Sequence, residues 1–182
     1  MIKNKKILIV GPSWVGDMVM SQSLYQLLKK QNSEMIIDVL APAWTKPLLD
    51  CMPEVNEAIA LPFQHGEFQL SQRYQFGRSL QDRHYDQAIV LPNSWKSALI
   101  PWVAKIPRRI GWRGELRYGL LNDLRLLDKK KYPLMVERFM ALGIDRDGDI
   151  SEPYPAPRFF VKKEWIEETI SLFNLKLSEK PI

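Results

Sequence analysis

The sequence is poor in cysteine and in long apolar runs. A single cysteine, Cys51, among 182 residues excludes an internal disulfide framework and is typical of a reducing compartment. The first apolar run, residues 7–10, is too short for the core of a signal peptide. No stretch approaches the ~20 apolar residues of a membrane-spanning helix. We therefore expect a cytoplasmic protein.

Metal-ligating patterns are also scarce. The only histidines, His65 and His84, have no cysteine or second histidine at ligand spacing, so we expect no transition-metal site. Asp145-Arg-Asp147 spells the D-x-D of metal-dependent sugar transferases. It lies in a polar loop rich in glycine and proline, and we interpret it as a surface turn.

The positive charge is concentrated in one segment. The chain has a net charge of +5, whereas residues 105–131 hold nine Lys or Arg and three Asp or Glu, a net charge of +6. Such a segment predicts an anionic partner: phosphate groups, nucleic acid or an acidic membrane surface. The alternative is a solvated basic face without a ligand.

Apolar runs alternate with amphipathic stretches along most of the chain. The patterns predict strands at residues 7–10, 35–40, 57–61, 87–91, 109–112 and 159–161. They predict helices at residues 18–30, 45–52, 70–83, 94–105, 132–142 and 163–173. Alternation of this kind is typical of an α/β fold, so we expect a Rossmann-like, doubly wound and mainly parallel sheet.

The loop after the first predicted strand is the most informative segment. Its residues 11–17, Gly-Pro-Ser-Trp-Val-Gly-Asp, join a strand to a helix where a doubly wound sheet binds its ligand. The loop has Ser13 where a dinucleotide fingerprint needs glycine, and Asp17 where a Walker loop has lysine. An acid there favours a hydroxyl ligand over a phosphate. Asp17 is either a general base that takes a proton from a sugar hydroxyl, or only a favourable first-turn acid.

Two further groups of residues follow later strands. Asn93 and Lys96 come after the fourth predicted strand, at the same carboxyl edge as Asp17, and Lys96 suits a phosphate or carboxylate. A helix cap followed by a solvated lysine is the alternative. Residues 108–118 mix arginines with aromatics, which suits phosphates through Arg113 and Arg117 or suits nucleic-acid bases.

Five blocks of the sequence, taken in order, resemble the lipopolysaccharide heptosyltransferases. They are Gly11-Pro-Ser-Trp-Val-Gly-Asp-Met, Pro53-Glu-Val-Asn-Glu-Ala, Leu91-Pro-Asn-Ser-Trp-Lys-Ser-Ala, Gly111-Trp-Arg-Gly-Glu-Leu-Arg-Tyr-Gly and Pro133-Leu-Met-Val-Glu-Arg. The resemblance implies the GT-B fold, in which two Rossmann-like domains face each other. It also implies inverting transfer of heptose from ADP-L-glycero-D-manno-heptose to the first heptose of the lipopolysaccharide inner core.

The resemblance assigns roles to particular residues. It makes Asp17 the catalytic base and implies an acceptor site formed by Ser13, Trp14, Asn93, Lys96, Arg113 and Arg117. It implies ADP-heptose as the donor substrate and no cofactor. It also implies no metal, because the domain beyond this sequence can stabilise the leaving diphosphate. It also implies a lipid-linked acceptor at the cytoplasmic face of the inner membrane, where the protein would be peripheral.

The resemblance also divides the chain. We expect an acceptor-binding domain over residues 1–157 and an interdomain segment over residues 158–182 that leads to a donor domain beyond this sequence. The alternatives are transfer to a Kdo acceptor within the same family, or a non-catalytic basic α/β module that binds nucleic acid. A dehydrogenase half is disfavoured because the G-x-G-x-x-G fingerprint is absent.

Overall fold

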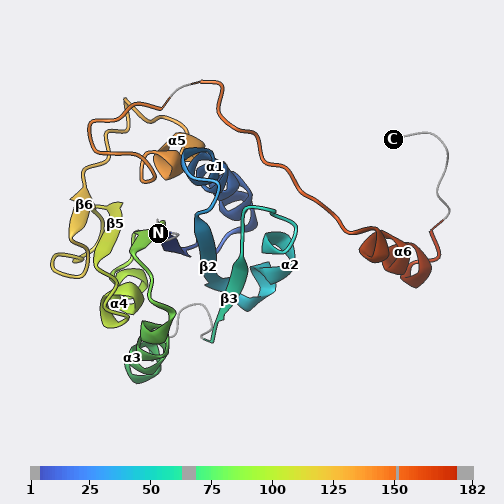
Figure 1. Ribbon diagram of the computed structural model, residues 1–182, viewed down its shortest axis with the longest axis horizontal. Coiled ribbons are helices and arrows are strands. Elements are labelled where there is room, and N and C mark those ends of the chain that lie inside the picture. Colours follow the sequence, from blue (N-terminus) through green and yellow to red (C-terminus); the bar gives the residue numbers. More distant parts are fainter. Residues whose placement is uncertain (1–4, 63–68, 151, 176–182) are drawn as a thin grey trace.

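Six parallel strands form one sheet in the computed structural model, which describes residues 5–62, 69–150 and 152–175. The order across the sheet is β3-β2-β1-β4-β5-β6 (Figure 1). Their bounds are β1 Lys6–Val10, β2 Ile36–Pro42, β3 Glu57–Leu61, β4 Gln87–Val90, β5 Arg108–Trp112 and β6 Asp123–Arg125. Every neighbouring pair is parallel. The predicted Rossmann-like, doubly wound sheet is confirmed.

The strand order reverses between β1 and β4. From β1 the chain proceeds to β2 and β3 on one side, and from β4 it proceeds to β5 and β6 on the other. Val10 pairs with Val90 at the last register position of these two strands. The loops that follow β1 and β4 therefore leave the sheet side by side, which is where open α/β sheets bind ligands.

Helices cover both faces of the sheet. Alternate residues of β1 point to opposite sides: Ile7 and Ile9 join one apolar cluster, whereas Leu8 and Val10 join the other. Helices α1 (Val15–Gln31) and α5 (Met135–Met140) pack together on the first side, and α3 (Leu70–Ser79) and α4 (Trp95–Val103) pack together on the second (Figure 1). Burial on both faces explains the continuous apolar runs of the central strands β1 and β4.

Several helices are shorter than the sequence patterns predicted. In the stretch 45–52 only the single-turn helix α2 (Lys46–Leu49) forms, directly after the 3₁₀ turn η1 (Ala43–Thr45). The stretch 70–83 divides into α3 and the 3₁₀ turn η2 (Gln81–Arg83), and α5 occupies only part of 132–142. In the last case the side chain of Glu137 accepts a hydrogen bond of 2.8 Å from the backbone N–H of Leu134, which fixes the helix start after Pro133.

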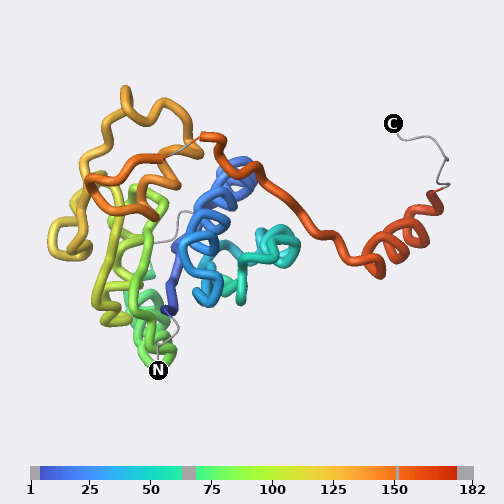
Figure 2. Tube along the Cα trace, turned by 45° about the horizontal axis from the view of Figure 1, so that its top comes forward, coloured from blue at the N-terminus to red at the C-terminus, as the bar shows by residue number. Residues whose placement is uncertain are grey.

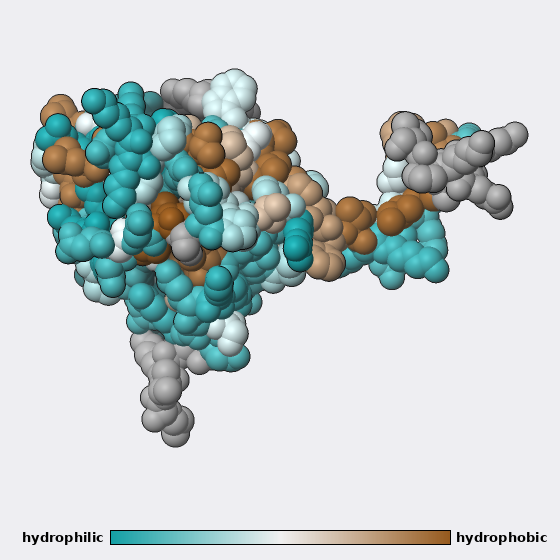
Figure 3. All heavy atoms as spheres, turned by 90° about the horizontal axis from the view of Figure 1, so that it is seen from above, coloured by the Kyte–Doolittle hydropathy of each residue, from teal (hydrophilic) through white to brown (hydrophobic). Residues whose placement is uncertain are grey.

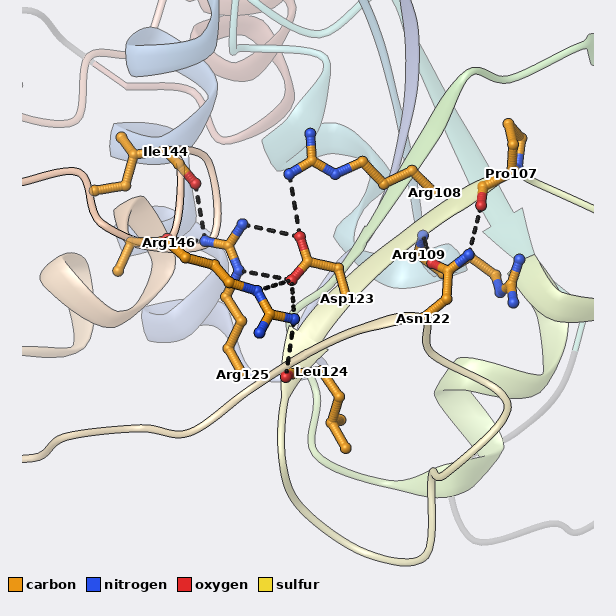
Figure 4. A network of polar contacts seen from close by, with 10 residues as sticks. Pro107, Arg108, Arg109, Asn122, Asp123, Leu124, Arg125, Ile144 and Arg146 are labelled. Atoms are coloured by element: carbon orange, nitrogen blue, oxygen red, sulfur yellow. Dashed lines mark hydrogen bonds and ion pairs between the residues drawn. The ribbon is translucent and has the colours of Figure 1, made fainter.

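Strand β6 lies at the sheet edge and was not predicted from the sequence. Its central feature is Asp123, whose carboxylate contacts three arginines: Arg108 and Arg125 at 3.1 Å and Arg146 at 2.8 Å (Figure 4). Burial by itself would raise the pKa of Asp123, but hydrogen bonds and charge from the arginines outweigh it and lower the pKa to about 2. Ion pairing thus replaces the apolar packing that marks the other strands.

The prediction of a strand at residues 159–161 is wrong. The backbone N–H of Phe160 donates to the carbonyl oxygen of Cys51 at 2.8 Å, but these residues form no ladder with a described strand. Prolines at 153, 155 and 157 remove backbone donors just upstream. The stretch is an extended segment that lies along α1, where Ser23 donates to Pro155 and Gln22 to Arg158.

Helix α6 (Lys163–Leu172) projects away from the rest of the structure (Figure 2). None of its residues is buried, and Ile166, Leu172 and Phe173 are exposed. Brown, hydrophobic side chains continue from the body onto the segment that leads to it (Figure 3). The predicted amphipathic helix at 163–173 is therefore present, but its apolar side has no partner among the described residues.

Candidate active site at the switch point

The loop after β1 places a carboxylate at the carboxyl edge of the sheet. Helix α1 begins at Val15, so Asp17 lies in its first turn. The side chain of Asp17 is half-exposed and forms no hydrogen bond or ion pair with the parts of the chain that the structure describes. The backbone N–H groups of this turn stabilise a negative charge. Asp17 is thus an ionisable group at the switch point that the described fold does not use.

The two glycines of this loop have different surroundings. A Cβ on Gly11 would lie 3.1 Å from Met18 Cε and 3.3 Å from Val39 Cγ1, so glycine there allows close packing of the loop on β2 and α1. A Cβ on Gly16 would meet no atom within 4 Å. Glycine inside a helix is unfavourable by roughly 1 kcal/mol relative to alanine. Since packing does not require it, Gly16 keeps open space beside Asp17.

The loop after β4 presents Asn93 and the start of α4. Ser94 is the N-cap of α4, and its hydroxyl accepts a hydrogen bond of 3.4 Å from the backbone N–H of Ser97. The capping role therefore falls to Ser94, and Asn93 is exposed. Lys96 lies in the first turn of α4 and is half-buried. The strands that precede the two loops, β1 and β4, are neighbours in the sheet.

The loop after β5 is locked to the loop after β4. The guanidinium of Arg117 donates to the carbonyl oxygens of Pro92, at 2.6 Å, and Trp112. The carboxylate of Glu115 accepts from the backbone N–H of Trp95 at 3.1 Å, at the start of α4. A Cβ on Gly114 would lie 2.6 Å from the carbonyl oxygen of Asn93. These contacts fix the loop that carries Asn93 and the start of α4 that carries Lys96.

The two arginines predicted to bind the acceptor have different environments. Arg117 is 1% exposed, and burial lowers the pKa of its guanidinium to about 10. Its terminal nitrogens donate to the main-chain carbonyls of Pro92 and Trp112 and to the side-chain oxygen of Asn93, the last at 3.4 Å. Arg113 is exposed, and its backbone N–H bonds to Arg125. Of the pair, Arg113 has the accessible guanidinium, whereas the placement of Arg117 favours holding the two loops together.

Exposed aromatic side chains flank this edge. Trp14 is 73% exposed in the β1 loop, Trp44 57% exposed after β2 and Tyr118 66% exposed after β5. Trp44, Tyr118 and Glu115 were not among the residues selected from the sequence. The signal that could have found Trp44 and Tyr118 is their position just beyond the carboxyl end of a strand. Ser13, the remaining predicted residue, is half-buried beside Trp14.

The other features singled out in the sequence lie elsewhere. Asp145 and Asp147 are exposed in a turn closed by a 3.0 Å bond from the N–H of Gly148 to the carbonyl of Asp145, as predicted. His84 is exposed, and His65 lies outside the described residues. Over residues 5–62, 69–150 and 152–175, no three His, Cys, Asp or Glu side chains could jointly hold a metal ion. No helix in these ranges is long and apolar enough to span a membrane.

These observations define a Rossmann-like α/β fold with a carboxylate at its switch point. Residues 73–182 match the model of glycosyltransferase family 9 (heptosyltransferase). The chain belongs to this family.

Named relatives agree with the family match. The chain is 53% identical to lipopolysaccharide heptosyltransferase 2 of Escherichia coli K12 over 97% of its length and 52% of the relative. It is also 53% identical to lipooligosaccharide heptosyltransferase 2 of Haemophilus influenzae, with the same coverage. The solved structure of E. coli ADP-heptose LPS heptosyltransferase II matches with a TM-score of 0.86 and 51% identity, over 97% of this chain and 52% of that chain. The chain spans about half the length of the curated relatives it matches.

Proposed function

We propose that the protein containing this chain is an inverting glycosyltransferase. It moves heptose from ADP-L-glycero-D-manno-heptose to the first heptose of the lipopolysaccharide inner core. The observation that carries this proposal is the unpartnered Asp17 carboxylate at the switch point of a family 9 chain. Identity of 53% to enzymes named heptosyltransferase 2 favours a heptosylated acceptor over a Kdo acceptor.

In this mechanism Asp17 is the general base. Its carboxylate takes the proton of the acceptor hydroxyl while the hydroxyl oxygen forms a bond to the anomeric carbon of heptose. The bond from that carbon to the diphosphate breaks on the opposite side, so ADP leaves and the anomeric centre inverts. Positive charge develops on the heptose ring in an oxocarbenium-like transition state. No covalent bond to the protein forms, and the open space at Gly16 admits the acceptor next to the base.

We assign acceptor binding to the edge around Asp17. Ser13 and Trp14 come from the β1 loop, Asn93 from the β4 loop, Lys96 from the first turn of α4 and Arg113 from the β5 loop. Lys96 and Arg113 supply positive charge for a phosphorylated acceptor. Arg117 acts through the loops: its bonds to Pro92 and Trp112 support a positioning role instead of the direct contact expected from the sequence.

The division of the enzyme follows from the same comparison. We assign acceptor binding to residues 1–157 and propose that residues 158–182 lead into a donor-binding domain that accounts for the unmatched length of the relatives. The exposed apolar residues of α6, Ile166 and Leu172 among them, support this, because an apolar helix face requires a partner.

The partners and location follow from the substrates. We propose a lipid-linked acceptor at the cytoplasmic face of the inner membrane, with the enzyme peripheral to that membrane. ADP-heptose is the donor, and the proposed displacement requires neither a metal nor a cofactor, because cationic groups of the donor domain can stabilise the departing diphosphate.

The test is a transfer assay with the full-length protein. ADP-heptose is offered together with inner-core acceptor that ends in heptose, or with acceptor that ends in Kdo. We expect ADP release and an added heptose only with the heptosylated acceptor. Transfer to the Kdo acceptor alone would establish the alternative within the family, and absence of transfer to both would refute the proposed activity.

A further inference from the structure

A groove lies between α3 and α4, on the face of the sheet opposite α1. The two helices approach closely at Gly77, where a Cβ would lie 2.7 Å from Val103 Cβ. On the outer side their side chains diverge and leave a groove of about 710 Å³, lined by Leu70, Ser71, Tyr74, Gln75, Leu99 and Trp102. The proposed reaction uses none of these residues.

The lining of this groove is apolar and open to solvent. The exposed fractions of Leu70, Tyr74 and Trp102 are 46–49%. Large aromatic side chains such as tyrosine and tryptophan normally bury most of their surface. Contiguous exposed apolar surface rimmed by polar groups marks an interaction site. A partner that binds this groove must therefore have apolar groups that contact these side chains.

The two helices that form the groove carry basic but no acidic residues. Helices α3 and α4 contain three Lys or Arg, at positions 73, 78 and 96, and no Asp or Glu. Arg78 follows Tyr74 by one helical turn, and Lys105 follows Trp102 by three residues. The side chains of both basic residues are exposed and have no hydrogen-bond or ion-pair partner in the described part of the chain. An apolar groove with this rim suits a partner that is apolar inside and anionic at its surface.

We propose that this α3–α4 surface, formed by Leu70, Tyr74, Arg78, Leu99, Trp102 and Lys105, docks on an anionic lipid bilayer. Tryptophan and tyrosine prefer the level of the lipid headgroups, and basic side chains near the surface attract anionic headgroups. Apolar side chains such as Leu70 then enter the boundary with the acyl chains. Nucleic acid would satisfy the charge but would leave the apolar groove lining without an apolar partner.

The position of the surface relates it to the acceptor. Lys96 lies in the first turn of α4 and Trp102 lies six residues later on the same helix, about 9 Å along its axis. This relation to the acceptor rests on the proposed function, in which the acceptor is lipid-linked. A bilayer held at Trp102 brings a lipid-linked sugar within reach of the edge that carries Lys96 and Asp17, while the lipid stays in the membrane.

The test is sedimentation of the 182-residue chain with lipid vesicles. One set is phosphatidylcholine alone, and the other is an equimolar mixture of phosphatidylcholine and phosphatidylglycerol. We expect binding to the mixed vesicles, weakened roughly tenfold or more in the double variant Tyr74→Gln/Trp102→Gln. The double variant Arg78→Gln/Lys105→Gln should lose the preference for phosphatidylglycerol. All substituted side chains are exposed, and thermal unfolding checks that each variant is folded.

A matched control carries Leu126→Gln and Lys129→Gln, an exposed apolar and basic pair after β6. It should bind vesicles like the unchanged chain. Equal binding by all variants, equal loss in the control, or binding to duplex DNA but not to vesicles would each overturn the proposal. Transfer to soluble, deacylated acceptor by the full-length enzyme is measured separately. Absence of transfer would refute the proposed activity without affecting the vesicle result. Absence of vesicle binding would refute membrane docking without affecting the transfer result.

Discussion

The guanidinium of Arg117 donates a 2.6 Å hydrogen bond to the carbonyl oxygen of Pro92 and so joins the loops that follow β5 and β4. The same side chain also bonds to Trp112, at the end of β5. Four residues earlier, Arg113 points its guanidinium to solvent. Two arginines of one short segment therefore have separate roles, one within the scaffold and one accessible to a ligand.

Replacing Arg117 with Met should destabilise the fold. The change leaves buried carbonyl oxygens without a charged donor, and we expect a loss of about 2–4 kcal/mol in the free energy of unfolding. Arg113→Ala is the control and should stay within about 0.5 kcal/mol, because its side chain is exposed. Urea unfolding of both variants measures the difference. Equal stability of the two would contradict the structural role of Arg117.

Arg113→Ala should instead affect substrate binding. In the full-length enzyme we expect a higher KM for phosphorylated acceptor, by the equivalent of about 1.5–3 kcal/mol, because a charge-assisted contact is lost. The effect should shrink with dephosphorylated acceptor. Lys129→Ala, a change of another exposed basic residue, is the control and should leave KM unchanged. Equal effects on both acceptors would exclude a phosphate contact.

Asp123 should make stability depend on acid pH. Its pKa of about 2 in the fold lies below the ordinary value of about 3.9 in an unfolded chain, so its stabilisation is complete above about pH 4 and is lost as the pH falls towards 2. We expect this contribution to be about 1–2 kcal/mol, reduced by solvent screening. Urea unfolding between about pH 5 and pH 2 should show a shallower fall for Asp123→Asn. Asp149→Asn, at an exposed position, should follow the unchanged chain.

The sequence predicted the central sheet well because its strands are buried on both faces. The runs around Ile9 and Ile89 read as strands without tertiary information, since both residues are fully buried. Strand β6 has no such signal: it is stabilised by pairing with β5 and by the ion pairs of Asp123, whose partners Arg108 and Arg146 lie 15 and 23 residues away in the sequence. The opposite error occurred at Phe160. The apolar residues there predicted a strand, but no neighbouring strand pairs with them in the described structure.

The location of the site was predictable, but the environment of each side chain was not. Asp17 and Asn93 follow strands that end at one edge, and the switch-point rule places them together. The distinction between Arg113 and Arg117 depends on the close approach of Gly114 to Asn93, which only the folded loops reveal.

The 182-residue chain should bind ADP weakly or not at all. In our proposal the nucleotide site belongs to the donor domain, and the switch point of this chain carries an acid, Asp17, that repels a diphosphate. Titration calorimetry with ADP measures this directly. A micromolar Kd, which corresponds to about 8 kcal/mol of binding free energy, would place the nucleotide site in this half and overturn the proposed division.

Gly16→Ala should separate stability from activity. Alanine is the better helix former, and its Cβ meets no atom within 4 Å, so we expect the free energy of unfolding to rise by about 0.5–1 kcal/mol. The added methyl group occupies the space beside Asp17, so the kcat/KM of the full-length enzyme should fall. A stabilised variant with unchanged kcat/KM would show that the acceptor does not use this space.

Asp17→Asn tests the chemical step. The amide keeps the shape of the side chain at the first turn of α1 but cannot accept the proton of the acceptor hydroxyl. We expect kcat of the full-length enzyme to fall by roughly 10²–10⁴-fold, the usual contribution of a general base. The KM for acceptor and the unfolding temperature should change little, because Asp17 forms no hydrogen bond or ion pair with the described residues. Steady-state kinetics and thermal unfolding of the same preparation measure both effects. Near-normal kcat, or activity lost only through unfolding, would make Asp17 a structural first-turn acid and refute the proposed mechanism.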